Sequence, residues 1–180
     1  MNDKSEFIIL PPDFFHLTLR DRMSDARCYI KDVLEVIKSI RQPSDRLIIK
    51  YRTENQRRLF PTDETARVGY GKILDFCLPH TIVIGMPNSA TWECLLNDIS
   101  YYSFMDFQRI EKNKLCDKDS ITRLSKFLYI AQNKEELLYN ILQRRIYRHG
   151  ILKKSLIFEN GSNLNDIISI ILTAKTKGNP

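Results

Sequence analysis

The sequence predicts an α/β fold in which a parallel sheet of five or six strands is covered by helices on both faces. Short apolar runs alternate with amphipathic segments along the 180 residues, and this alternation is typical of βαβ units. No repeat, low-complexity segment or linker divides the chain, whose length is ample for one buried core. We therefore expect a single domain over residues 1–180.

The first half of the chain contains two expected strands and a long helix. A strand over 7–10 is stopped by the prolines that follow it, and a second strand covers 46–50. Between them, Ser24 is a favourable N-cap for a helix that ends before Pro43. Residues 52–68 have the composition of a loop with a short helix. The apolar face of the long helix has helical spacing and consists of Ile30, Val33, Leu34, Ile37 and Ile40.

The second half continues the alternation up to a frayed C-terminal tail. Asn133 and Glu136 have the spacing of a capping box, and Gly150 is the expected stop of that helix, whose apolar face contains Leu142. The expected helices cover 71–78, 89–97, 133–150 and a segment from 163; the expected strands cover 81–85, 99–104, 127–131 and, as a short extended piece, 156–158; the tail covers 174–180.

Composition restricts the partners without identifying one. The 28 basic and 22 acidic residues give a net charge of +6, which suits anionic substrates, anionic lipid head groups or nucleic acid. We expect no nucleic-acid partner, because aromatic and basic residues are not interleaved and no known binding motif occurs. Neither a membrane-spanning run nor a signal peptide is evident, so we expect a cytoplasmic protein. The four cysteines form no CxxC pair, which favours reduced thiols and no metal site.

The segment after the third strand has the pattern of an anion site. The strand 81–85 is followed by Asn88 and Ser89 at a helix start, where backbone N–H groups are unpaired and face the positive end of the helix dipole. We expect Asn88, Ser89 and Thr91 to contact a phosphate, and Glu93, one turn further on, to contact a neighbouring sugar hydroxyl. The alternatives are ordinary N-capping and a favourable acidic residue in the first turn.

Lys50 and Arg52 lie at the end of the second strand and would neutralise a diphosphate at the same edge of the sheet. The alternative interpretation is surface charge at a strand end. A second basic group, Arg144, Arg145 and Arg148, is expected at a helix end. It would favour a membrane surface as a further partner, although cations at a helix C-terminus have a simpler electrostatic cause.

The segment TIVIGMPNSATWECLLNDISYYSF resembles the C-terminal domain of GT-B glycosyltransferases and of surface-carbohydrate and glycerophosphate transferases. The resemblance extends loosely over about two thirds of the chain. It implies a Rossmann-like domain, one half of a GT-B enzyme, that binds a nucleotide-sugar or CDP-activated donor as substrate and needs no cofactor. It also implies a separate acceptor-binding domain or subunit, and surface polysaccharide synthesis at the inner face of the membrane.

The sequence departs from that family at the second strand end. A Lys-x-His-Pro-like stretch is frequent there, whereas this chain has Lys50-Tyr51-Arg52-Thr53. Without the histidine and the proline, no catalytic residue can be assigned. The alternative function is therefore a degenerate, non-catalytic binding or assembly module that keeps the fold.

Overall fold

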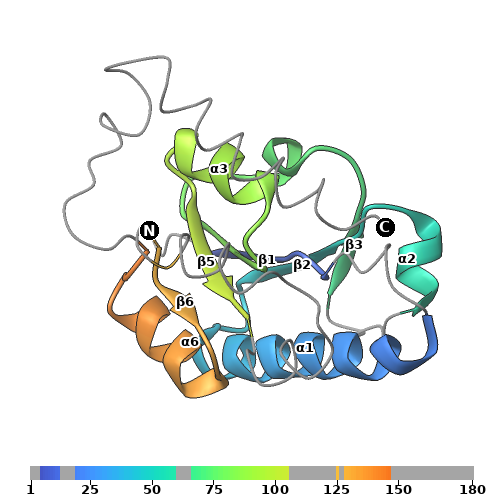
Figure 1. Ribbon diagram of the computed structural model, residues 1–180. Helices are drawn as coiled ribbons and strands as arrows, with labels where there is room; N and C mark the ends of the chain where they lie inside the picture. Colours follow the sequence, from blue (N-terminus) through green and yellow to red (C-terminus); the bar gives the residue numbers. More distant parts are fainter. Residues whose placement is uncertain (1–4, 13–18, 60–65, 106–124, 126–127, 147–180) are drawn as a thin grey trace, which may run out of the picture.

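The structure is a computed structural model that describes residues 5–12, 19–59, 66–105, 125 and 128–146. It contains a six-stranded sheet in the order β3-β2-β1-β4-β5-β6 (Figure 1). Every pairing is parallel. The strands are β1 (Glu6–Ile9), β2 (Arg46–Lys50), β3 (Arg67–Gly69), β4 (Thr81–Gly85), β5 (Ser100–Phe104) and β6 (Ile130–Ala131).

Helices cover both faces of this sheet, as the sequence predicts. Helices α1 (Leu19–Ile40) and α6 (Lys134–Leu142) lie on one face, and α3 (Ser89–Leu96) lies on the other with the 3₁₀ helix η1 (Ile73–Phe76) (Figure 1). The short helix α2 (Glu54–Leu59) joins β2 to β3. The molecule is thus a three-layer α/β structure of the Rossmann-like kind.

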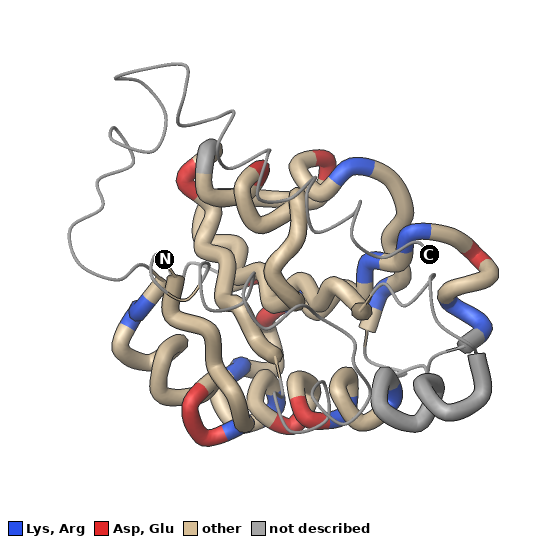
Figure 2. Tube along the Cα trace, in the orientation of Figure 1, with Lys and Arg blue, Asp and Glu red and all other residues tan. Residues whose placement is uncertain are grey.

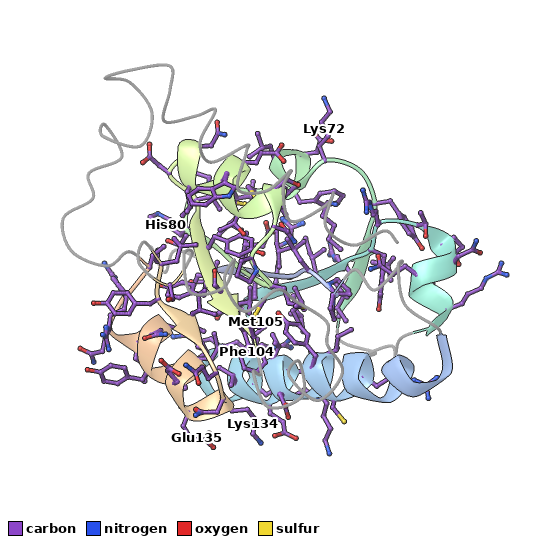
Figure 3. The ribbon with its side chains drawn as sticks, viewed as in Figure 1. Lys72, His80, Phe104, Met105, Lys134 and Glu135 are labelled. Atoms are coloured by element: carbon purple, nitrogen blue, oxygen red, sulfur yellow. The ribbon has the colours of Figure 1, made fainter. Side chains whose placement is uncertain are left out.

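Alternation along the strands supplies a separate core to each face. In β1 and β2, Phe7, Ile9 and Ile49 pack against α1, whereas Ile8 and Ile48 face η1 and α3. At the end of β5, Phe104 and the residue after it, Met105, enter opposite cores (Figure 3). Because both faces are buried, the central strands β1, β2 and β4 contain continuous apolar stretches instead of alternating with polar residues.

The strand order reverses between β1 and β4. The chain starts in the middle of the sheet, continues outward through β2 and β3, and then returns to the other side of β1. Ile9 of β1 pairs with Ile84 of β4, and the Leu10 N–H donates to the Ile84 carbonyl at 2.9 Å. In open parallel sheets, ligands bind outside the carboxyl ends of the strands at such a reversal.

One strand was absent from the sequence-based prediction. Residues 52–68 were expected to be a loop with a short helix; the helix exists as α2, but Arg67–Gly69 forms β3. Only Gly69 of this strand is buried, so no apolar run indicates it. It forms because its backbone pairs with β2, with the Tyr51 N–H donating to the Gly69 carbonyl at 3.0 Å.

The prediction that Ser24 caps the first helix is wrong. Helix α1 begins at Leu19, so Ser24 lies inside it. Neither glycine nor proline occurs between Leu19 and Ile40, and the helix continues over this whole stretch. Its predicted apolar face is confirmed, with Ile30, Val33 and Ile37 fully buried.

Helix α6 begins as predicted and ends earlier. Asn133 Oδ1 accepts the Glu136 N–H at 2.8 Å, but the Glu136 carboxylate returns to the N–H of Gln132 and not to that of the cap. The expected end at Gly150 is wrong, because the helix stops at Leu142, where Arg144 takes a left-handed φ of 51°. The Arg145 and Arg144 N–H groups donate to the Asn140 and Ile141 carbonyls at 2.8 and 3.1 Å, which is a Schellman motif.

This early end changes two further expectations. Leu142 was placed on the apolar face but is 61% exposed. Arg144 and Arg145 follow the helix, and the Arg145 guanidinium lies over the Tyr129 ring, 4.0 Å from its centroid. The remaining C-terminal expectations, which concern Arg148, the segment 156–158, the helix from 163 and the tail 174–180, lie outside the described residues.

A glycine at the end of β4 permits a close contact with β5. A Cβ on Gly85 would overlap the Tyr101 hydroxyl oxygen and come within 3.0 Å of Leu10 Cβ. Across this gap the Tyr101 hydroxyl donates to the Met86 carbonyl at 2.7 Å. The side chain of β5 therefore holds the turn that leads from β4 into α3.

Replacing this glycine should destabilise the protein through Tyr101. We expect Gly85→Ala to lower the free energy of unfolding by about 1–3 kcal/mol, the usual cost of overpacking a core, in urea denaturation. Tyr101→Phe removes the overlapping oxygen, so the double variant should lose less than the sum of the two single losses. Additive losses would show that the two side chains do not compete for this space.

Candidate functional site

The candidate site lies at the carboxyl edge of the sheet, where β2 and β4 end on either side of β1. Since neighbouring strands are about 4.8 Å apart, these two strand ends are separated by about 10 Å. Lys50 is the last residue of β2 and, by alternation, lies on the same face as Ile48, which packs toward η1 and α3. The predicted residues on 50–52 and 88–93 therefore share one edge and one face of the sheet.

Lys50 is half-buried in a mixed electrostatic environment. Burial lowers the pKa of its ammonium; the nearby Arg52 guanidinium acts in the same direction, and the carboxylates of Glu93 and Asp75 oppose it. Among the described residues, none makes a direct hydrogen bond or ion pair with Lys50. The structure thus places a partly desolvated cation between β2, η1 and α3. Among the nearby charged groups, the Glu93 carboxylate has the largest effect on the pKa of Lys50.

Asn88 is the N-cap of α3. Ordinary N-capping was the alternative interpretation to a phosphate contact. Its Oδ1 accepts the Ala90 N–H at 2.8 Å, and Thr91 Oγ1 accepts the Asn88 N–H at 2.9 Å, so the two side chains complete a capping box. Thr91 is only 1% exposed and its hydroxyl also interacts with Tyr101. A ligand could reach this hydroxyl only if the cap opened.

Ser89 and Glu93 remain accessible on the first turns of α3. Ser89 is exposed at the first helical position, where its backbone N–H has no intrahelical acceptor, and Glu93 is half-buried one turn further on. Arg52 is exposed at the rim, where its backbone N–H donates to the Gln56 side chain. Of the predicted set, Lys50, Ser89 and Glu93 have side chains that are neither fully buried nor used in the cap of α3. A ligand contact stays a prediction for all six residues.

Basic residues surround the Lys50 side of this edge. Helix α2 carries Arg57 and Arg58, β3 begins with Arg67, and Lys72 precedes η1. Figure 2 shows Lys and Arg positions in blue around α2 and β3. Glu54 offsets part of this charge, because it pairs with Arg57 at 3.4 Å and accepts a hydrogen bond from Tyr70. Among the described residues around α2 and β3, basic side chains outnumber acidic ones, and this excess would attract a phosphate group.

Sequence reasoning missed two residues of this site. Asp75, in η1, lies near Lys50. The Tyr101 hydroxyl donates to the Met86 carbonyl and so stabilises the turn between β4 and α3. Burial raises the pKa of Tyr101, so its hydroxyl stays protonated and donates. Neither role has a signal in the sequence, since Asp75 comes near Lys50 only through the crossover from β3 to β4.

A pocket of about 540 Å³ lies at the opposite, amino edge of the sheet. It is bounded by the starts of β4 and β5 and by the residues that follow η1 and α3. None of the predicted site residues lines it. The lining residues are Leu74, Cys77, Leu78, Pro79, His80, Thr81, Asn97, Asp98, Ile99 and Ser100.

Comparisons of this chain with protein-family models, with curated proteins and with solved structures find no match. Within the part of the chain that the structure describes, no helix has the length and apolarity needed to cross a membrane. In the same part, no three His, Cys, Asp or Glu side chains are grouped so that they could hold a metal ion.

Capping and ligand contact can be separated by substitution. Asn88→Ala should lower the free energy of unfolding by about 1 kcal/mol, because it removes the cap of α3. Ser89→Ala, at the neighbouring exposed position, should change it by less than about 0.5 kcal/mol. Urea denaturation of both variants checks this. Equal losses in the two would mean that the Asn88 side chain does not stabilise the helix start.

Proposed function

We propose that this chain binds a nucleoside diphosphate, as part of a nucleotide-sugar or CDP-activated donor, at the carboxyl edge beside the β1–β4 reversal. The observation that carries the proposal is the half-buried Lys50 beside Glu93, on the face of the sheet where α3 begins. Burial of a cation is costly unless an opposite charge compensates it. A bound diphosphate would supply that charge.

Each accessible residue has a distinct role in this proposal. The Lys50 ammonium acts as a point charge on the diphosphate, and the Ser89 N–H and hydroxyl donate to the same group at the positive end of α3. Glu93 accepts hydrogen bonds from ribose hydroxyls. Asn88 and Thr91 hold the helix start in place, and Arg52 at the rim attracts the ligand.

The sugar-transfer part of the proposal is supported by the resemblance of 81–104 to GT-B donor domains. Transfer needs an acceptor site, which in that architecture belongs to a second domain or subunit. The expected contribution of this chain is electrostatic: Lys50 and the α3 N-terminus stabilise the negative charge that develops on the departing nucleoside diphosphate. The catalytic base is then expected from the acceptor-binding part.

The capping of the α3 N-terminus by Asn88 favours a second function, that of a non-catalytic module. Asn88 Oδ1 already accepts first-turn N–H groups, and the pocket described above lies at the other edge of the sheet. A non-catalytic binding or assembly module would have this arrangement. The two functions differ in whether a nucleotide binds at all.

Titration of the whole chain with uridine, cytidine and adenosine diphosphates by calorimetry tests the proposal. We expect saturable binding that Lys50→Met weakens about tenfold or more, since a hydrogen bond to a charged group contributes about 1.5–3 kcal/mol. Ser89→Ala combined with Glu93→Ala should abolish it while the far-UV spectrum stays unchanged. Lys31→Met is the matched control, because Lys31 lies on α1 on the other side of the sheet. Absence of binding at millimolar nucleotide would support the non-catalytic module instead.

The lowered pKa of Lys50 predicts a pH dependence of binding. A diphosphate favours the charged ammonium, so the pKa of Lys50 should be higher in the complex than in the free protein. Affinity is then constant below the free-protein pKa, where Lys50 is charged in both states. Above it, binding must take up a proton, and affinity should fall by about tenfold per pH unit until the pKa of the complex is reached. Lys50→Met should remove this dependence, and an unchanged profile in that variant would assign it to another group.

A further inference from the structure

Two cysteines from different elements meet on the α3 side of the sheet. Cys77 follows η1 and is half-buried, and Cys94 lies on α3 and is 0% exposed. Both side chains belong to one core cluster, and the two thiols are close enough to shift each other's ionisation. The Cys77 thiol also lies 3.3 Å from the Ile73 carbonyl oxygen, which holds it beside η1. The two thiols are thus neighbours in the native fold without a covalent bond.

Only one of these thiols is open to a reagent from solution. Cys77 lines the pocket at the amino edge, together with His80 and Asp98 (Figure 3 labels His80). Cys94 does not line that pocket and is closed off in the core formed by Ile8, Val83 and Leu95. A small molecule that enters the pocket therefore meets Cys77 first.

The surroundings also give the two thiols different ionisation. The interaction with Cys94 lowers the pKa of Cys77, against burial and the carboxylates of Glu6 and Glu93. The same interaction and burial raise the pKa of Cys94, and the Lys50 ammonium opposes them weakly. Cys77 is the thiol that ionises first, and the thiolate is the nucleophile in disulfide exchange.

We propose that Cys77 and Cys94 form a reactive dithiol that a low-molecular-weight disulfide oxidises to an intramolecular disulfide. The Cys77 thiolate attacks one sulfur of the reagent, whose S–S bond breaks, and the released thiolate takes a proton from water. Cys94 then loses its proton and attacks the Cys77 sulfur, which displaces the second half of the reagent as a thiol. The protein dithiol loses two electrons and two protons, and the reagent is reduced to two thiols.

Oxidation of this dithiol does not require the proposed nucleotide site to be functional. The dithiol lies toward the amino edge of the sheet, and its formation requires no ligand at Lys50. Cys28, the third cysteine in the described part of the chain, lies on α1 on the other face of the sheet and serves as a control. Cys116 lies outside the described residues and is removed by substitution in the test.

The experiment treats the full chain carrying Cys116→Ser with glutathione disulfide and then alkylates the remaining thiols for peptide mass spectrometry. We expect a linked peptide pair that joins Cys77 to Cys94, loss of two hydrogen atoms from the intact mass, and no retained glutathione. With Cys94→Ala added, Cys77 should retain one glutathione, because nothing displaces it. With Cys77→Ala added, Cys94 should react at least about tenfold more slowly than Cys77 does. Adding Cys28→Ser should leave the disulfide unchanged.

Three results would overturn the proposal: a stable glutathione adduct on Cys77 while Cys94 is present, a disulfide that includes Cys28, or equal alkylation of Cys77 and Cys94 before and after oxidation. If Cys94→Ala does not fold, alkylation rates in the unsubstituted native protein replace it. Cys77 should then react with iodoacetamide at least about tenfold faster than Cys94. The reverse order would overturn the proposal as well.

Discussion

The hydrogen bond from Tyr101 to the Met86 carbonyl is the contact on which the carboxyl edge depends. It exists because Gly85 has no side chain between the Tyr101 hydroxyl and the turn. The same Tyr101 interacts with Thr91, whose Oγ1 accepts the Asn88 N–H. Strand β5, the turn after β4 and the start of α3 are thereby joined through buried polar groups, each of which has a partner. The positions of Ser89 and Glu93 relative to Lys50 follow from this connection.

Helix α3 links two edges of the sheet that carry different chemistry. It begins beside Lys50 at the carboxyl edge and ends at the amino edge, where Asp98 takes a left-handed φ of 60° and the Ile99 N–H donates to the Cys94 carbonyl at 2.9 Å. Consecutive residues of the helix serve the two sides: Glu93 faces Lys50, and Cys94 meets Cys77. A shift of α3 would therefore alter the proposed anion site and the dithiol together, since a helix moves as a rigid unit.

Much of the fold follows from apolar runs and capping residues that can be identified in the sequence. The prediction failed where a strand has no apolar run and where a residue other than glycine ends a helix. The apolar runs 46–50 and 81–85 coincide with β2 and β4. Asn88 and Asn133 cap the helices that were expected to begin there. Strand β3 was missed because only Gly69 in it is buried. The end of α6 was placed too late because Arg144, which has a Cβ, takes the left-handed conformation that glycine usually provides.

The sequence by itself determined the α/β class, the strands that are buried on both faces and the helix start at Asn88, since these depend on neighbouring residues and on composition. The tertiary structure alone decided the strand order, with its reversal between β1 and β4, and it alone brought Lys50 near Glu93 and Cys77 near Cys94. These depend on how distant segments pack across the sheet. Local propensity carries no information about which strand a crossover will join, so the candidate residues could be named from the sequence while their arrangement could not.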